Sequence, residues 1–326
     1  MTSQKTNKDV VEKSVETQET DSEGEKCMGY EIKHVTVAGC GTLGSQIAFQ
    51  TAFKGFHVTV YDVDDTAIET GKQFLQKIAA QYQEDVHQSK EQTQAIYDSI
   101  HFRTDLKKAA QHADLVIEAI PEVKEIKQAF YQRLAAVAPN ETIVTSNSST
   151  MLPSELADYT GRPENFLMMH FSNEIWKNNT AEIMKHTGTS THSFNAVQQF
   201  AGNIGMLPLP LYKEQPGYIL NSLLNPFFEA AQRLLIDGVA DVETIDKIWM
   251  AATGAEQGPF AALDAIGLET VYNVSKLIGD EGDASSKQIA AYIKQHYLDE
   301  GKLGTASGEG FYTYPNPVFQ QDDFLK

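Results

Sequence analysis

The hydrophobic pattern divides the sequence into two parts with different periodicity. In the first part, short apolar runs alternate with segments of helical periodicity such as 42–54 and 124–138. The apolar runs lie at 34–39, 57–62, 115–120, 143–148, 166–171 and 206–211. Near-continuous apolar strands separated by helices are typical of a mostly parallel sheet covered on both faces. The pattern therefore predicts an α/β fold with a doubly wound, Rossmann-type sheet.

The strand pattern stops after Pro216. Helical periodicity then dominates 217–236, 241–253, 259–278 and 285–299, with breaks at 237–241 and 279–285 that carry helix-stop and N-cap residues. We expect an α/β domain over residues 29–213 and an all-α domain over 214–326. Residues 1–28 are polar and lack aromatic side chains, so we expect a disordered tail there.

Composition removes several classes of function. The formal net charge of −18 argues against a nucleic-acid partner, because binding phosphates requires a basic face. No apolar run is long enough to span a membrane and the first residues lack a secretory core, so we expect a cytoplasmic protein without membrane contact. The two cysteines, Cys27 and Cys40, fit a reducing compartment and offer no four-ligand metal site, so we expect no metal.

A glycine-rich loop follows the first predicted strand. The segment 39-GCGTLG-44 has the G-x-G-x-x-G spacing, which is weak evidence alone but stronger between a strand and a helix. Gly39 permits a tight turn, Gly41 lets the backbone approach a pyrophosphate, and Gly44 allows close packing of helix on strand. The start of the helix then faces the phosphates. The expected cofactor-binding residues here are Gly39, Gly41, Thr42, Leu43 and Gly44.

The second predicted strand ends on Asp62, eighteen residues after Gly44. Its carboxylate is suited to accept hydrogen bonds from the adenosine ribose hydroxyls, and it would repel a 2′-phosphate. No arginine follows at 63–65 to bind such a phosphate. The sequence therefore favours NAD over NADP as the cofactor. The alternative is a glycine turn in an α/β domain that binds no nucleotide.

One histidine lies where a catalytic base is needed. His170 ends a predicted strand, at the sheet edge where doubly wound folds bind ligands. Alcohol oxidation by a nicotinamide cofactor needs a base for the hydroxyl proton, and a carboxylate such as Glu182, twelve residues later, can orient the imidazole. By spacing alone, ordinary polar positions at strand ends are favoured for both residues, because chance pairs are common among nine histidines and 44 acidic residues.

The whole arrangement resembles the 3-hydroxyacyl-CoA dehydrogenase family from about residue 32 to residue 314. The matching segments are 39-GCGTLG-44, 114-DLVIEAIPE-122, 146-SNSST-150, 170-HFSN-173, 215-QPGYILNSLL-224, 258-GPF-260 with 263-LDAIGL-268, and 301-GKLGTASGEGFYTY-314. The resemblance implies NAD-dependent interconversion of 3-hydroxyacyl and 3-oxoacyl groups. It also implies an all-α second domain that forms a homodimer.

The resemblance assigns roles to individual residues. It makes His170 the acid-base residue, Glu182 its orienting partner, and Ser149 and Asn221 the residues that hold the substrate C3 oxygen. The positions expected to line the nicotinamide-ribose end are Glu122, Lys127, Ser149 and Asn173. From the residues alone, Ser149 is also compatible with a cap of the helix predicted near 153–158, and Asn221 with an ordinary polar helix position.

Departures from the family pattern concern the substrate. Where the family motif reads His-Phe-Phe-Asn-Pro, this chain has Ser172 and Glu174. The positions that contact CoA in animal members correspond to Ile78 and Asp85, and a Lys or Arg near the C-terminus is replaced by Thr305. These residues are poorly suited to a nucleotide phosphate, although Lys72 or Lys77 are possible replacements.

The variant segment 170-HFSNEIWKNNTAE-182 looks closest to the diketoreductase branch of the same family, which reduces 3-oxo or 3,5-dioxo esters with NADH. In that branch Trp176 would form an aromatic wall of the substrate site, and the alternative is that it packs at the domain interface. A short-chain 3-hydroxyacyl-CoA is thus the expected substrate, and a CoA-independent 3-oxo acid or ester the close alternative. A catalytically silent NAD-binding protein with a structural or sensing role is a third possibility.

Overall fold

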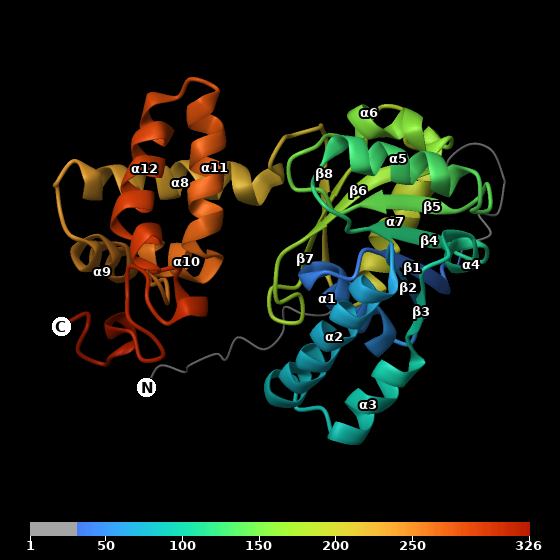
Figure 1. Ribbon diagram of the computed structural model, residues 1–326, viewed down its shortest axis with the longest axis horizontal. Helices are drawn as coiled ribbons and strands as arrows, with labels where there is room; N and C mark the ends of the chain where they lie inside the picture. The colour runs from blue at the N-terminus through green and yellow to red at the C-terminus, as the bar shows by residue number, and fades with distance from the viewer. Residues whose placement is uncertain (1–30) are drawn as a thin grey trace, which may run out of the picture. The chain divides into compact units, whose positions relative to one another are not determined.

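The computed structural model describes residues 31–326, so the predicted tail at 1–28 lies outside the described residues. Eight strands form one sheet in the order β3-β2-β1-β4-β5-β6-β7-β8 (Figure 1). The strands are β1 (His34–Ala38), β2 (His57–Tyr61), β3 (His101–Arg103), β4 (Leu115–Glu118), β5 (Ile143–Ser146), β6 (Phe166–Phe171), β7 (Thr180–Met184) and β8 (Leu207–Leu211).

The order of the strands creates a binding crevice. From β1 the chain runs outward to β2 and β3, then returns to place β4 on the other side of β1. The connections leave β1 and β4 in opposite directions, so a crevice opens at their carboxyl ends, where doubly wound folds bind ligands. All neighbouring strands are parallel except β6 and β7, which are antiparallel. The predicted doubly wound, mostly parallel sheet is confirmed.

Helices cover both faces of the sheet. They are α1 (Thr42–Phe53), α2 (Asp65–Asp85), α3 (Lys90–Ser99), α4 (Leu106–Ala110), α5 (Lys124–Ala135), α6 (Pro153–Leu156) and α7 (Thr191–Asn203). Buried side chains of α4, α5 and α6, including Leu106, Phe130 and Leu156, pack with strand residues in one core cluster. On the opposite face α1 lies against β1 and β2, and α7 lies against β6, β7 and β8. The fold therefore has three layers, with the sheet in the middle.

Two strands were missed by the sequence pattern. The strand β3 has only three residues and is mostly exposed, so it carries no apolar signal. The strand β7 reads TAEIM, and Glu182 at its centre interrupts the apolar run although the strand is largely buried. The edge strand β8 contains two prolines, which a sheet tolerates only at its edge.

The C-terminal part is helical, as predicted. Its helices are α8 (Tyr218–Ile236), α9 (Val242–Thr253), α10 (Pro259–Ile266), α11 (Leu268–Asp280) and α12 (Ala284–His296), and α11 and α12 lie side by side (Figure 1). The single helix predicted over 259–278 is wrong, because Gly267, with φ 95°, separates α10 from α11. None of the helices within 31–326 has the length and apolar character needed to cross a membrane.

Two buried carboxylates tie the C-terminal segment to these helices. Asp246 on α9 accepts hydrogen bonds from the backbone N–H of Phe260 (3.0 Å) and from the Tyr312 hydroxyl (3.0 Å). Asp264 on α10 accepts the Tyr312 N–H (2.9 Å) and the Tyr314 hydroxyl (3.1 Å). Burial raises the pKa of both carboxyls. Tyr312 therefore bridges the two carboxylates, which gives the segment 301–314 a structural role.

Candidate active site

The glycine-rich loop lies at the carboxyl end of β1 and opens onto the crevice. Gly39 has φ 97°, a conformation that favours glycine, and a Cβ on Gly44 would clash with the carbonyl oxygen of Gly39. A Cβ on Gly41 would meet nothing within 4 Å, so the backbone there faces open space. The first N–H groups of α1 are thus available to an anionic ligand.

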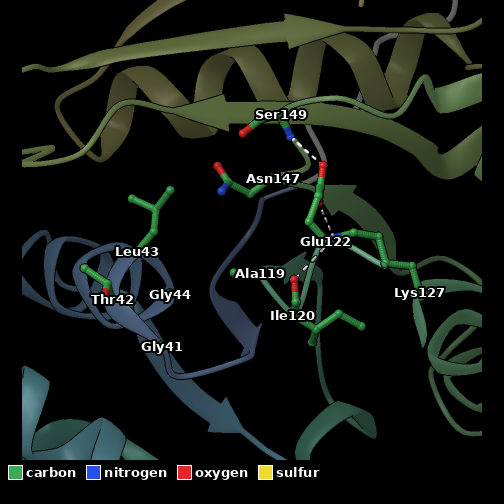
Figure 2. A pocket seen from close by; sticks show the side chains of 10 residues that line it. All are labelled: Gly41, Thr42, Leu43, Gly44, Ala119, Ile120, Glu122, Lys127, Asn147 and Ser149. Carbon is green, nitrogen blue, oxygen red and sulfur yellow. Dashed lines mark hydrogen bonds and ion pairs between the residues drawn. The ribbon is translucent and has the colours of Figure 1, made fainter. Parts of the chain in front are cut away.

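A pocket of about 180 Å³ lies between this loop and the ends of β4 and β5. The N-terminus of α1 borders it on one side and Glu122 and Lys127 on the other (Figure 2). The lining residues are Gly41, Thr42, Leu43, Gly44, Ala119, Ile120, Glu122, Lys127, Asn147 and Ser149. Seven of the residues predicted from sequence to bind the cofactor are among them, so these seven residues lie at one pocket.

Asp62 lies beside the loop rather than in this pocket. Its Oδ2 accepts hydrogen bonds from the Cys40 N–H (2.9 Å) and the Cys40 thiol (3.1 Å), and its Oδ1 accepts the Val63 N–H (2.7 Å). Burial, together with the neighbouring carboxylate of Asp62, raises the pKa of the Cys40 thiol to about 12, so this thiol stays protonated. The predicted ribose-binding carboxylate is therefore held against the glycine loop.

His170 lies between a carboxylate and a hydroxyl. It stands directly opposite Glu182 in the antiparallel pair of β6 and β7. The distance from His170 Nδ1 to Glu182 Oε2 is 3.3 Å, and that from His170 Nε2 to Ser149 Oγ is 3.2 Å. A carboxylate only accepts hydrogen bonds, so Nδ1 donates and Nε2 of the neutral ring accepts from Ser149. Since Ser149 also lines the pocket, the histidine adjoins the crevice.

The first turn of α8 completes the environment of Glu182. The backbone N–H groups of Ile219 (2.8 Å) and Leu220 (3.1 Å) donate to Glu182 Oε1. Burial alone would raise the pKa of this carboxyl, but the hydrogen bonds from His170 and from these two N–H groups outweigh it and hold the pKa below its ordinary value. Glu182 is therefore a carboxylate at neutral pH, able to stabilise a protonated His170.

Tyr218, the first residue of α8, stacks on the histidine. Its ring lies 4.4 Å from that of His170 with an interplanar angle of 14°, and its hydroxyl donates to the Ser148 carbonyl oxygen (2.7 Å). Tyr218 has φ 57° and follows Gly217 with φ 77°, so two successive left-handed residues turn the chain into α8. A left-handed conformation is uncommon for tyrosine and occurs where surrounding contacts hold it. The stack and the hydroxyl bond are such contacts.

Glu122 fixes the loop that carries Ser149. Its Oε1 accepts the backbone N–H of Ser149 (3.0 Å) and of Thr150 (3.1 Å), and also the Ser148 hydroxyl. The helix α6 begins at Pro153 after the N-cap Leu152, so the alternative that Ser149 caps this helix is wrong. The Ser149 side chain is directed to His170 instead.

Two residues predicted to belong to the site, Asn221 and Asn173, lie apart from the other predicted site residues. Asn221 sits in the first turn of α8, and its side chain makes no hydrogen bond to any residue of the described part of the chain. Asn173 is exposed in the segment between β6 and β7, where its carbonyl oxygen accepts from the Asn178 side chain (2.8 Å). Neither residue lines the pocket. In residues 31–326 no group of His, Cys, Asp and Glu is arranged to hold a metal ion.

Neither expectation for Trp176 is confirmed. Its indole N–H donates to Asp85 Oδ2 (2.9 Å) at the end of α2, and its ring lies 5.3 Å from that of Tyr82. Lys177 also pairs with Asp85 (2.9 Å). The indole therefore anchors the segment after β6 to α2, because Tyr82 and Asp85 offer it an aromatic face and an acceptor. Ile78, the other position compared with CoA contacts, is buried in α2.

Sequence reasoning missed several residues of the site. Tyr218 was not singled out, although an aromatic residue directly after Pro216-Gly217 signals an unusual turn. Asn147 follows β5 and accepts the Phe171 N–H (2.9 Å), which ties the serine loop to the end of β6. Glu118 ends β4 beneath the pocket. Position at the carboxyl end of a strand is the signal that would have found Asn147 and Glu118.

Both parts of the chain match one protein family. Residues 34–215 match the NAD binding domain of 3-hydroxyacyl-CoA dehydrogenase, and residues 217–314 match the C-terminal domain of 3-hydroxyacyl-CoA dehydrogenase. A probable 3-hydroxybutyryl-CoA dehydrogenase of Bacillus subtilis (strain 168) is 33% identical over 284 residues, which cover 87% of this chain and 98% of that protein. The mitochondrial hydroxyacyl-coenzyme A dehydrogenase of Homo sapiens is 32% identical over 87% of this chain and 91% of its own length.

Solved structures agree with this assignment. The structure of a diketoreductase that catalyses reactions of dicarbonyl compounds has a TM-score of 0.84 and 48% identity, over 87% of this chain and 99% of that one. The (S)-3-hydroxybutyryl-CoA dehydrogenase PaaH1 of Ralstonia eutropha has a TM-score of 0.76 and 26% identity, over 88% and 100% of the two chains. The matches to both domains, added to the fold and the crevice, establish that this chain is an NAD-dependent oxidoreductase that belongs to the 3-hydroxyacyl-CoA dehydrogenase family.

Proposed function

We propose that the protein interconverts the 3-hydroxy and 3-oxo forms of an acyl group with His170 as the acid-base residue. The observation that carries the proposal is the position of His170 between Glu182 and Ser149, 3.3 Å and 3.2 Å away, beside the pocket of the glycine loop. A base with an orienting carboxylate and a neighbouring hydroxyl is the set of groups that proton transfer at a carbinol oxygen requires. A protein that only binds NAD has no need of this set.

The cofactor residues are proposed on the same basis. Gly39, Gly41, Thr42, Leu43 and Gly44 would hold the pyrophosphate, Asp62 the adenosine ribose, and Glu122, Lys127, Ser149 and Asn173 the nicotinamide-ribose end. The open space at Gly41 and the free N–H groups of α1 fit a pyrophosphate. When bound, NAD supplies the hydride acceptor at its nicotinamide ring, and its reduced form supplies the hydride.

His170 moves the proton that accompanies the hydride. In the oxidation, Nε2 takes the proton of the substrate hydroxyl as the C3–H bond breaks and its hydride leaves. In the reduction, a protonated His170 gives the Nε2 proton to the C3 oxygen as the new C3–H bond forms. Glu182 accepts from Nδ1 in both directions and stabilises the imidazolium.

Ser149 and Asn221 are proposed to hold the C3 oxygen. Ser149 Oγ is already at His170 Nε2, so an oxygen bound there has both the donor and the proton-transfer group within reach. The Asn221 side chain makes no hydrogen bond within residues 31–326, which leaves its amide free for the same oxygen. Neutral donors of this kind stabilise the negative charge that develops during carbonyl reduction.

A short-chain 3-hydroxyacyl-CoA is the first candidate substrate, supported by the names of the relatives. A CoA-independent 3-oxo acid or ester is the second, and a specific observation favours it. Asp85 is engaged by Trp176 and Lys177 and Ile78 is buried, so neither position offers a contact to a nucleotide phosphate. The structure of a diketoreductase is also more similar in sequence than the 3-hydroxybutyryl-CoA dehydrogenases compared above.

The two substrate classes are separated by following NADH oxidation with acetoacetyl-CoA, free acetoacetate and an acetoacetate ester side by side. A large preference in kcat/KM for the thioester supports CoA binding. An equal or higher value for the ester supports the CoA-independent reading. No oxidation with any of the three, although NADH binds, would support a catalytically silent protein.

Replacement of His170 tests the acid-base assignment. We predict that His170→Ala lowers kcat by about two to four orders of magnitude while NADH affinity is retained, because the proton-transfer group is lost and the glycine loop is untouched. The exposed His112 provides a matched control, His112→Ala, which should keep wild-type turnover. Turnover of the His170 variant close to wild type would remove this residue from the mechanism.

We also propose a homodimer formed through the helical part. Leu223 on α8, Ile248 on α9 and Leu277 on α11 are 60% to 67% exposed, and a partner subunit would cover such apolar side chains. Light scattering of the purified full chain measures the mass directly, and a monomer at micromolar concentration would contradict the proposal.

We further propose that the two domains span residues 29–213 and 214–326 and that the protein is cytoplasmic. The family matches at 34–215 and 217–314 support these domain limits.

A further inference from the structure

A charged cluster of two buried residues and one exposed residue lies at the pocket. Glu118 at the end of β4 and Lys127 on α5 are 0% and 1% exposed, and their charged groups are 2.5 Å apart. Lys127 Nζ is also 3.2 Å from Glu122 Oε2, at the wall of the pocket. The cluster formed by Glu118, Glu122 and Lys127 therefore reaches from the interior to the pocket surface.

The hydrogen-bond partners of Lys127 and Glu118 are those of an ammonium group and a carboxylate. Lys127 Nζ has three oxygen neighbours, Glu118 Oε1, Glu122 Oε2 and the Ile120 carbonyl oxygen (3.4 Å), which match the three N–H donors of an ammonium group. Glu118 accepts four hydrogen bonds, from Lys127, the Ile120 N–H (2.9 Å), the Tyr131 hydroxyl (2.5 Å) and the Ser146 hydroxyl (2.6 Å). Four such donors match the acceptor sites of a carboxylate.

Glu122 is ionised as well. Burial alone would raise the pKa of its carboxyl, but the hydrogen bond from Ser148, the charge of Lys127 and the hydrogen bonds from Thr150 hold the pKa below its ordinary value. Two carboxylates and one ammonium leave the cluster with one negative charge in excess. Figure 2 shows Lys127 reaching between Glu122 and the Ile120 carbonyl oxygen at the wall of the pocket.

The oxidised and reduced forms of a nicotinamide cofactor differ by one hydride. The oxidised ring therefore carries a positive charge that the reduced ring lacks, while the phosphates and riboses are the same in both forms. A negative charge near the ring stabilises the oxidised form more than the reduced form, and solvent screens Glu118 and Lys127 only weakly because both are almost fully buried, whereas Glu122 is 38% exposed.

We propose that Glu118 gives the Glu118–Lys127–Glu122 cluster its excess negative charge and thereby makes the pocket bind oxidised NAD more tightly relative to NADH. Without Glu118, the charges of Lys127 and Glu122 cancel. The inference rests on the proposed position of the nicotinamide end at this pocket. Glu118 touches no ligand and acts through the field of the cluster, so it is a positioning residue and not a catalytic one. Because of this charge, NADH bound at the pocket is a stronger hydride donor than it would be beside a neutral cluster.

The test compares the dissociation constants of the full-length protein for NAD and NADH, measured by titration calorimetry and by NADH fluorescence. In Glu118→Gln the cluster is neutral, and the ratio Kd(NAD)/Kd(NADH) should rise by roughly three- to thirtyfold. In the double variant Glu118→Gln/Lys127→Gln, the only charged member of the cluster is Glu122, so the cluster again carries one negative charge. The ratio should then return to within about threefold of wild type, even though two residues have been changed.

Tyr131→Phe is the matched control, because it removes a hydrogen bond to Glu118 without changing the charge. Its ratio should stay within about twofold of wild type, whereas a ratio that rises as in Glu118→Gln would mean that packing and not charge is responsible. If Glu118→Gln does not fold, Glu122→Gln gives the same net charge from the pocket wall and should raise the ratio in the same direction; only the ratio is compared, because Glu122 also holds the Ser149 loop.

An unchanged ratio in the neutral variants, with NADH still bound, would overturn the inference and leave the proposed function intact. The converse outcome is equally distinct. If the ratio Kd(NAD)/Kd(NADH) follows the charge of the cluster while His170→Ala retains turnover, the inference about the cluster is supported and the acid-base assignment of His170 is contradicted.

Discussion

At the residue scale, the ring of Tyr218 is the contact of His170 that sequence reasoning did not anticipate. The ring stacks on the imidazole, and the hydroxyl holds the loop that carries Ser149 through Ser148. Both contacts restrict the histidine, but they act on different partners. Replacement by Phe removes only the hydroxyl bond and replacement by Ala removes both contacts, so comparing the two shows which contact the reaction needs.

We predict that Tyr218→Ala lowers kcat by about tenfold or more, because the imidazole loses the surface that keeps it facing Ser149. Tyr218→Phe retains the ring and should stay within about threefold of wild type. Steady-state kinetics with NADH, together with NADH affinity, gives both values. Equal turnover of the two variants would mean that stacking does not position the histidine.

The residues that the sequence identified are those with a local signature. His170 lies at the end of an apolar strand, Ser149 follows one, and the glycine loop carries its own spacing, so their places at the crevice could be predicted. Tyr218 and Glu118 act through partners 48 residues away (His170) and 9 residues away (Lys127). Such contacts depend on how elements pack, which spacing along the chain does not report. The family resemblance named functional positions but not these supports.

At the element scale, the junction of α10 and α11 shows how one glycine defines two helices. Gly267 has φ 95° and ψ 126°, a combination that side-chain-bearing residues rarely adopt. The apolar periodicity continues across it, which is why the pattern predicted a single helix over 259–278. Conformation at one residue, and not hydrophobicity, decides the break.

We predict that Gly267→Ala lowers the free energy of unfolding by about 1–3 kcal/mol because the backbone there is strained for any L residue. Gly202→Ala is the matched control, since Gly202 lies within α7 and an added Cβ meets nothing within 4 Å. This control should be neutral or stabilising by up to about 1 kcal/mol. Urea denaturation measures both, and a similar loss at the two positions would contradict the argument.

The strands also divide into those that the sequence pattern predicted and those that it missed. Runs with continuous apolar character were predicted, whereas β7 was missed because Glu182 lies at its centre. That carboxylate is tolerated in a buried strand because His170 and two N–H groups of α8 satisfy it. The local pattern broke at the residue that belongs to the proposed site, and the fold supplies its partners from another element.

At the scale of the whole molecule, the buried carboxylates of the helical part make its stability depend on pH. Burial raises the pKa of Asp246 and Asp264, so each binds its proton more tightly in the folded state than in the unfolded chain. Their contribution to stability is complete below about pH 3.9, the unfolded value, and is lost as the pH rises through the raised pKa. This direction is opposite to that of a salt-bridged carboxylate.

We predict that the difference in unfolding free energy between wild type and Asp246→Asn is largest near about pH 4 and shrinks toward pH 7. The asparagine does not titrate, and taking the difference cancels the other groups of the chain. Asp264→Asn should show the same trend. Urea denaturation across this range provides the measurement, and a difference that grows with pH would contradict the assigned direction of the shift.

The hydrogen bonds from Ile219 and Leu220 to Glu182 have a consequence for movement within the molecule. The carboxylate that orients His170 is held by the same N–H groups that begin α8. If the first turn of α8 withdraws, Glu182 loses two donors and Tyr218 leaves the imidazole in the same step. The orientation proposed for His170 therefore depends on the position of α8 as well as on the two strands that carry His170 and Glu182.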